Sequence, residues 1–289
     1  AFELVLDKQA DLGGLPPAVV SAASETAKDR GKPGKWAFTL AKPSLIPFLQ
    51  YSARRDLREK MFRAYIMRGN NANELDNKAN AVKIATLRLE RANLLGYPTH
   101  AAYVLEENMA KTPEAVFAFL EKIWKPALAR AKAEAAEMQA LIRQEGGTFK
   151  LQPWDWWFYA EKLRKARYDL DDSALRPYFQ LENVRSGAYD VARKLFGITF
   201  TELSDMPKYQ DDVRIFEVKD ADGSHLGILY VDYYPRPNKE GGAWMSNYRE
   251  QSIKDGVDIR PIIVNNGNFS KPTAGEPALI SFEEATTLF

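Results

Sequence analysis

Apolar and polar positions recur with the 3.6-residue period of α-helices over the first 200 residues. Leu57, Met61 and Tyr65, for example, share one face of such a segment. Proline at the start of a segment and glycine after its end mark the boundaries. These signals predict helices over residues 16–31, 52–67, 74–95, 112–145, 154–168 and 184–196.

Prolines modify this helical pattern at two places. Pro43 and Pro47 oppose a long helix, so residues 34–50 are predicted to be a connector. Pro126 lies inside the longest helical segment, where we expect either a kink or a break.

Near residue 210 the period of the apolar positions changes to two, which indicates strands. Asp222-Gly223 is a strong hairpin signal between strands predicted over residues 213–219 and 225–233. Further strands are predicted over residues 243–249 and 259–266. Ser281 and Glu284 then form a capping-box pattern at the start of another helix.

The elements together predict a mainly α fold, a large helical body with a small β-sheet near the C-terminal end. We expect residues 1–205 to form the helical region. Residues 206–289 are expected to contain the sheet and the start of the last helix. The short final segment has an apolar face but only about two turns, so we expect further sequence to follow it.

Composition excludes several classes of protein. Apolar residues make up 45% and charged residues 27%, as in ordinary globular domains. Forty basic and thirty-nine acidic residues leave no basic excess, so we expect no nucleic-acid partner. No apolar run approaches the roughly 18 residues of a membrane span, so we expect no membrane partner. The absence of cysteine excludes disulfides; we expect a cytoplasmic protein, with the periplasm as the alternative.

Catalytic signals are sparse in this sequence. The two histidines, His100 and His225, are placed as cap and turn residues, and a zinc site usually needs three protein ligands. The sequence contains no H-E-x-x-H, G-x-S-x-G, P-loop or G-x-G-x-x-G pattern. We therefore assign no catalytic and no metal-ligating residue. Glu283 and Glu284 suit the first turn of a helix, where negative charge is favourable.

For each of three segments, the sequence is compatible with either a binding role or a structural role. Residues 154–159 carry five aromatics that could stack a ligand, but burial in a core is the favoured interpretation. Residues 265–269 read first as a turn, although their amides could bind backbone groups. Gly241, Gly242, Ala243 and Trp244 could form an open strand edge that binds an extended peptide, or a plain glycine turn. For this last segment both interpretations stay open.

Ordered blocks along nearly the whole chain resemble the thimet oligopeptidase family of zinc metallopeptidases, with the closest likeness to bacterial peptidyl-dipeptidases. The blocks are GKWAFTL (34–40) with Pro43, REK (58–60), AY (64–65), RGN (68–70), LLGY (94–97), DW (155–156) with Tyr159, LRPYF (175–179), LFGI (195–198), GILYVDYYPR (227–236), Lys239 with GGA (241–243), NF (268–269), and Glu284 with Thr287 and Phe289. Each block is weak, but their order and spacing are specific.

The resemblance implies that the zinc motif, H-E-F-G-H, follows Phe289 on the same helix, and that the later ligand and catalytic groups lie beyond it. The chain would then be a middle segment of a peptidase that hydrolyses short unfolded peptides, with residues 1–205 as channel wall and 206–289 as part of a zincin-like catalytic domain. Zinc would belong to the intact enzyme, and this segment alone would bind none and be inactive. Gly241, Gly242, Ala243 and Trp244 are the expected substrate-binding residues.

A second hypothesis is a non-catalytic helical scaffold or peptide-binding module that is complete at 289 residues. The short last helix argues against it. Apolar surface left uncovered would favour pairing with a complementary C-terminal fragment or self-association.

Overall fold

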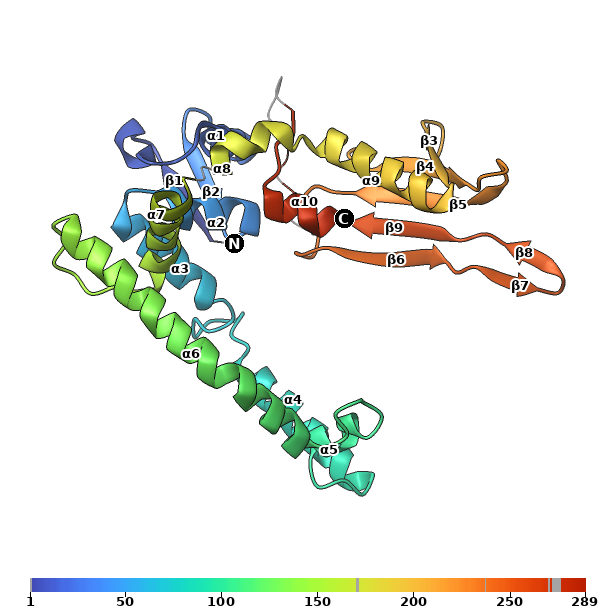
Figure 1. Cartoon of the computed structure of the whole chain (residues 1–289), viewed down its shortest axis with the longest axis horizontal. Helices are drawn as coiled ribbons and strands as arrows, with labels where there is room; N and C mark the ends of the chain where they lie inside the picture. The colour runs from blue at the N-terminus through green and yellow to red at the C-terminus, as the bar shows by residue number, and fades with distance from the viewer. Residues whose placement is uncertain (1, 170–171, 237, 270, 272–276) are drawn as a thin grey trace. The chain divides into compact units, whose positions relative to one another are not determined.

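The computed structural model describes residues 2–169, 172–236, 238–269, 271 and 277–289 (Figure 1). The chain is mainly α with small β-sheets, which confirms the expected fold class. It divides into two compact units, one of residues 1–54 and 164–289 and the other of residues 55–163. The expected boundary at residues 205 and 206 lies inside the first unit, and the assignment of channel wall and catalytic region stays a prediction.

The unit of residues 55–163 is helical. It contains α3 (Arg55–Ile66), α4 (Lys78–Leu94), α5 (His100–Leu105), α6 (Pro113–Gln144), the 3-10 helix η2 (Pro153–Asp155) and most of α7 (Trp156–Tyr168). These bounds agree with the predicted helices. α6 is continuous through Pro126, so of the two expected outcomes a break is excluded.

The aromatic segment of this unit is chiefly core. Trp154 and Tyr159 are buried, and Trp157 is 44% exposed. Buried Asp155 pairs with Arg58 at 3.0 Å and with Arg55 at 2.9 Å, so the segment also holds a buried ion pair. Burial lowers the pKa of Arg58, while its bond to Asp155 acts in the opposite direction. The structure thus favours the core interpretation over a stacking site.

The N-terminal part of the other unit corrects the predicted connector. β1 (Glu3–Leu6) pairs antiparallel with β2 (Trp36–Thr39), and η1 (Gln9–Leu12) and α1 (Pro17–Asp29) lie between them in sequence. Residues 42–51 form α2 (Lys42–Tyr51) instead of a loop. Pro43 lies in the first turn, where no N–H is needed, and Phe48 packs on Phe38 at 4.7 Å. Packing therefore outweighs the hydrogen bond that Pro47 removes.

The C-terminal part contains a five-stranded sheet in the order β3-β4-β5-β9-β6. The strands are β3 (Thr199–Leu203), β4 (Arg214–Lys219), β5 (His225–Asp232), β6 (Trp244–Arg249) and β9 (Ile262–Asn266). Neighbours are antiparallel except β5 and β9, which are parallel. β7 (Ser252–Lys254) and β8 (Val257–Ile259) form a separate hairpin between β6 and β9 in sequence. The sequence did not predict β3, β7 or β8.

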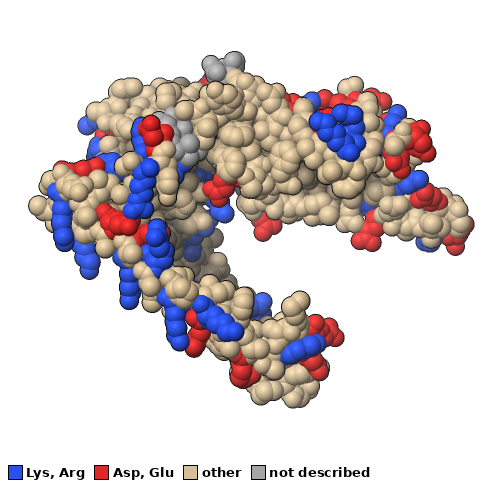
Figure 2. Space-filling model, viewed as in Figure 1, with Lys and Arg blue, Asp and Glu red and all other residues tan. Residues whose placement is uncertain are grey.

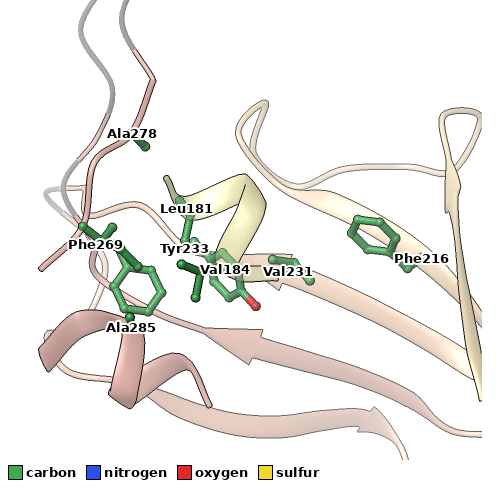
Figure 3. Close-up of a cluster of buried hydrophobic side chains, with 9 residues drawn as sticks. Leu181, Val184, Phe216, Val231, Tyr233, Phe269, Ala278 and Ala285 are labelled. Carbon is green, nitrogen blue, oxygen red and sulfur yellow. The ribbon is translucent and has the colours of Figure 1, made fainter. Parts of the chain in front are cut away.

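Helices complete this part of the chain. α8 (Asp172–Leu175), η3 (Arg176–Tyr178) and α9 (Leu181–Phe196) precede the sheet, and α10 (Phe282–Leu288) follows it. Figure 3 shows the buried cluster to which α9, the sheet and α10 contribute. Its members are Leu181, Val184, Phe216, Val231, Tyr233, Phe269, Ala278, Ile280 and Ala285. The capping box is confirmed, because the Ser281 hydroxyl accepts from the N–H of Glu284 and the Glu284 carboxylate from the N–H of Ser281.

Basic and acidic residues are nearly equal in number, 40 against 39. Figure 2 shows Lys and Arg side chains interspersed with Asp and Glu side chains on the visible face. Within the described residues, no helix is both long and apolar enough to cross a membrane.

Candidate functional site

The predicted substrate-binding segment lies at the start of an edge strand. Trp244 is the first residue of β6, which comes last in the strand order of the sheet (Figure 1). Trp244 pairs with Asn266 of β9 on one side. Gly241, Gly242 and Ala243 precede it and are exposed. An edge strand presents unpaired main-chain groups on its outer side, so the position suits the addition of another strand.

The two glycines differ in what the backbone requires of them. Gly242 has φ +102°, a conformation that residues with a side chain rarely adopt. Gly241 has no such restriction. A Cβ at either position would meet no atom within 4 Å. The positive φ of Gly242 thus explains this glycine, whereas nothing in the described part of the chain requires glycine at position 241.

The Asn268 side chain holds this segment. Its amide nitrogen donates to the carbonyl oxygens of Glu240 and Gly242, at 2.9 and 2.7 Å. The turn predicted over residues 265–269 is wrong. Asn265 and Asn266 are the last residues of β9, and residues 267–269 follow the strand without forming a turn. The amide of Asn268 binds backbone, which was the alternative interpretation of this segment.

A buried ionic cluster lies at the end of β5. Asp232 is 1% exposed and accepts hydrogen bonds from Lys239, Arg236 and Tyr209, each at 2.9 Å. The Lys239 ammonium also donates to the carbonyl oxygens of Asp232 and Tyr234, at 2.7 and 3.0 Å. The main-chain N–H of Gly267 donates to the same Asp232 carbonyl at 2.8 Å. The connection after β5 is therefore fixed to the segment that follows β9.

The charges in this cluster are set by opposing effects. Burial acts to raise the pKa of Asp232, but the bonds from Lys239, Tyr209 and Arg236 together hold that pKa below its usual value. Burial also lowers the pKa of Lys239, against the effect of Asp232. Sequence reasoning missed this cluster. A signal was present, because an Asp ends an apolar strand and basic residues follow four and seven positions later.

Three tyrosines surround a shallow hollow on one face of the sheet. Tyr209 stacks on Tyr230 with ring centroids 6.3 Å apart, and Tyr248 of β6 meets both rings edge-on. The hollow has a volume of about 350 Å³. Pro207, Lys208 and Ile262 complete its lining. It adjoins the end of β6 that is remote from the glycines.

The other candidates have structural roles. His225 Nδ1 lies 3.0 Å from a carboxylate oxygen of Glu217, and His100 is the first residue of α5. Glu284 accepts the capping bond described above. No group of three or more His, Cys, Asp or Glu side chains that could hold a metal occurs among the described residues. Those residues do not provide a site that fits a zinc ion.

Comparison with known proteins gives consistent matches. Residues 48–289 match the model of Peptidase family M3. The chain is 40% identical to dipeptidyl carboxypeptidase of Escherichia coli strain K12 over 287 residues, 99% of this chain and 42% of that protein. It is 37% identical to oligopeptidase A of the same strain over 292 residues, 99% of this chain and 43% of that protein. The chain thus spans less than half the length of these relatives. The resemblance seen in the sequence is confirmed, and the chain belongs to peptidase family M3.

Proposed function

We propose that the protein to which this chain belongs is a zinc-dependent peptidyl-dipeptidase or oligopeptidase that hydrolyses short unfolded peptides. Membership of the family supports this, as do the relatives, which are named dipeptidyl carboxypeptidase and oligopeptidase A. The described residues offer no metal site, so the zinc ligands would come from other sequence, and this chain alone would not cleave peptides.

The observation that carries the role of this segment is the open edge of β6. A peptide that lies beside Gly241–Trp244 can exchange main-chain hydrogen bonds with it and extend the sheet by one strand. Such pairing recognises the peptide through its backbone and places no requirement on its side chains. It therefore suits an enzyme that accepts many sequences. In this role the chain binds and orients the peptide, and bond cleavage requires groups that it does not supply.

Binding without catalysis is the second candidate, because the edge lies wholly within this chain. A peptide-binding module would use the same contacts and hold the peptide unchanged. The two functions differ in one observable, hydrolysis by the intact protein.

The exposed apolar face of α6 supports a further part of the proposal. Phe117, Leu120 and Trp124 recur at helical spacing and are 66%, 51% and 63% exposed. More than half of each relative's length lies outside the matched segment. We propose that such further sequence covers this face. Without it, the purified chain should associate with itself, which size-exclusion chromatography over a range of concentrations would detect.

Peptide cleavage by two protein preparations tests the function. The reading frame is sequenced beyond the codon for Phe289, and the full product and the 289-residue chain are each purified and incubated with zinc and a short peptide. Mass spectrometry should show release of short products by the full product alone, abolished by a chelator. Cleavage by the 289-residue chain, or none by a full product that carries H-E-x-x-H, would contradict the proposal.

A further inference from the structure

The segment that we propose to bind peptide is held by two sets of contacts from the chain itself. On one side the Lys239 ammonium makes three hydrogen bonds, to the Asp232 carboxylate and to the carbonyl oxygens of Asp232 and Tyr234. The Lys239 side chain is 2% exposed, so these bonds are shielded from water. Lys239 lies two residues before Gly241. Holding Lys239 in place therefore restricts the positions that Gly241 can occupy.

On the other side Asn268 binds the backbone around Gly241. Its side-chain amide donates to the carbonyl oxygens of Glu240 and Gly242. The carbonyl oxygen of Gly241, which lies between them in sequence, does not accept from Asn268. In the part of the chain that the structure describes, the N–H and C=O of Gly241 have no hydrogen-bond partner. The two hydrogen bonds from Asn268 thus occupy the neighbouring acceptors. The N–H and the C=O of Gly241 remain as one donor and one acceptor for another backbone.

Stability alone does not account for this arrangement. Asp232 and the Lys239 side chain are almost fully buried, and the removal of two charges from water costs free energy that their attraction does not always recover. An apolar pair of similar volume can serve a fold as well or better. The ionic pair differs from an apolar pair because its hydrogen bonds constrain the orientation of the two side chains as well as their distance.

We propose that Asp232, Lys239 and Asn268 are positioning residues, which hold Gly241 and Gly242 in the conformation that accepts the peptide backbone. The inference rests on the proposed function of this edge. A segment fixed before binding loses less conformational freedom when the peptide arrives, so the cluster raises affinity without touching the peptide.

Peptide affinity in matched variants of the 289-residue chain tests the inference. A fluorescein-labelled hexaalanine peptide is titrated by fluorescence anisotropy into the unmodified chain and into Lys239→Met and Asn268→Ala. Asn268 is not buried, so Asn268→Ala keeps the test open if Lys239→Met does not fold. Asp155→Asn is the control, because it weakens an equally buried ion pair that lies in the other compact unit. Thermal unfolding of each variant shows that binding is measured on folded protein.

We expect Lys239→Met and Asn268→Ala to weaken binding by about tenfold or more, and Asp155→Asn to lower stability with affinity unchanged. If the unmodified chain binds and the folded variants bind equally well, the positioning role is wrong while the peptide-binding edge stands. If Asp155→Asn weakens binding as much as the others, the effect is general destabilisation and the inference falls. If the unmodified chain binds no peptide, the proposed edge fails and the positioning role fails with it.

Discussion

The two ends of the edge strand β6 are held in different ways. Its start is fixed by the buried cluster of Asp232 and Lys239 and by the amide of Asn268. Its far end leads into the hairpin of β7 and β8, where nearly every residue is exposed, Ile253 at 80% and Val257 at 62%. That hairpin pairs with itself over three residue pairs.

The difference shows which end of β6 is held in place by contacts with the rest of the sheet. Buried charges hold the start of β6 at a defined point of the sheet. The described residues of the hairpin include no buried side chain, and beyond its own ladder Asp258 forms a partly exposed ion pair with Arg260. Local opening costs least where few apolar contacts are buried. We therefore expect the start of β6 to be preformed for binding and the hairpin to open readily.

The largest expected effect follows from breaking the buried cluster. Lys239→Ala leaves Asp232 without its most buried partner, and loss of one member of a buried pair costs about 3–5 kcal/mol of unfolding free energy. Urea unfolding measures this. Lys254→Ala, an exposed lysine of β7, is the matched change on the hairpin and should shift stability by less than about 0.5 kcal/mol. Equal losses for the two variants would remove the contrast between the ends.

A smaller effect separates the two glycines. Gly242→Val forces a side chain into a left-handed backbone conformation and should cost about 1–3 kcal/mol of stability. Gly241→Val meets open space and no such restriction, so stability should change little while a peptide backbone is kept away. Its peptide affinity should fall by about tenfold, which titration of a labelled peptide measures. If Gly241→Val binds as well as the unmodified chain, the segment is only a turn.

The smallest effect is expected on the hairpin. Ile253→Ser and Val257→Ser remove side chains that are largely exposed. Stability should change by no more than about 0.5 kcal/mol, and peptide affinity should stay the same. Calorimetry and the same titration check both. A marked loss of affinity would extend the binding site along β6 into the hairpin.

Local signals in the sequence predicted local structure well. The capping box at Ser281 and the Asp222-Gly223 hairpin are present where they were expected, because each depends on residues a few positions apart. Asp255-Gly256 is a comparable turn signal between β7 and β8, which sequence reasoning overlooked. Three of the five residues of β3 are polar and three are exposed, so the alternation of its residues was weak.

The sequence did not indicate which segments pair when they are far apart along the chain. Trp244 lies on an edge strand because β9 inserts between β5 and β6, and nothing local specifies that order. The same holds for Asp232, whose partners are brought together by the turn after β5 and by the loop that carries Tyr209. The glycine segment was predicted as a candidate, but its anchoring is visible only in the fold.

Backbone methylation of the peptide tests the central claim most directly. Two labelled hexaalanine peptides are compared by titration into the 289-residue chain, one unmodified and one N-methylated at every residue, so that the amide donors of both edges are lost. A third peptide, N-methylated at alternate residues, keeps the donors of one edge and controls for the change in conformation. If the peptide adds to β6 as a strand, the fully methylated form should bind about tenfold or more weakly, whereas the alternately methylated form can turn its unmethylated edge to β6 and should bind much as the unmodified peptide does. Equal affinity for all three peptides would show that Gly241–Trp244 do not bind the peptide through its backbone.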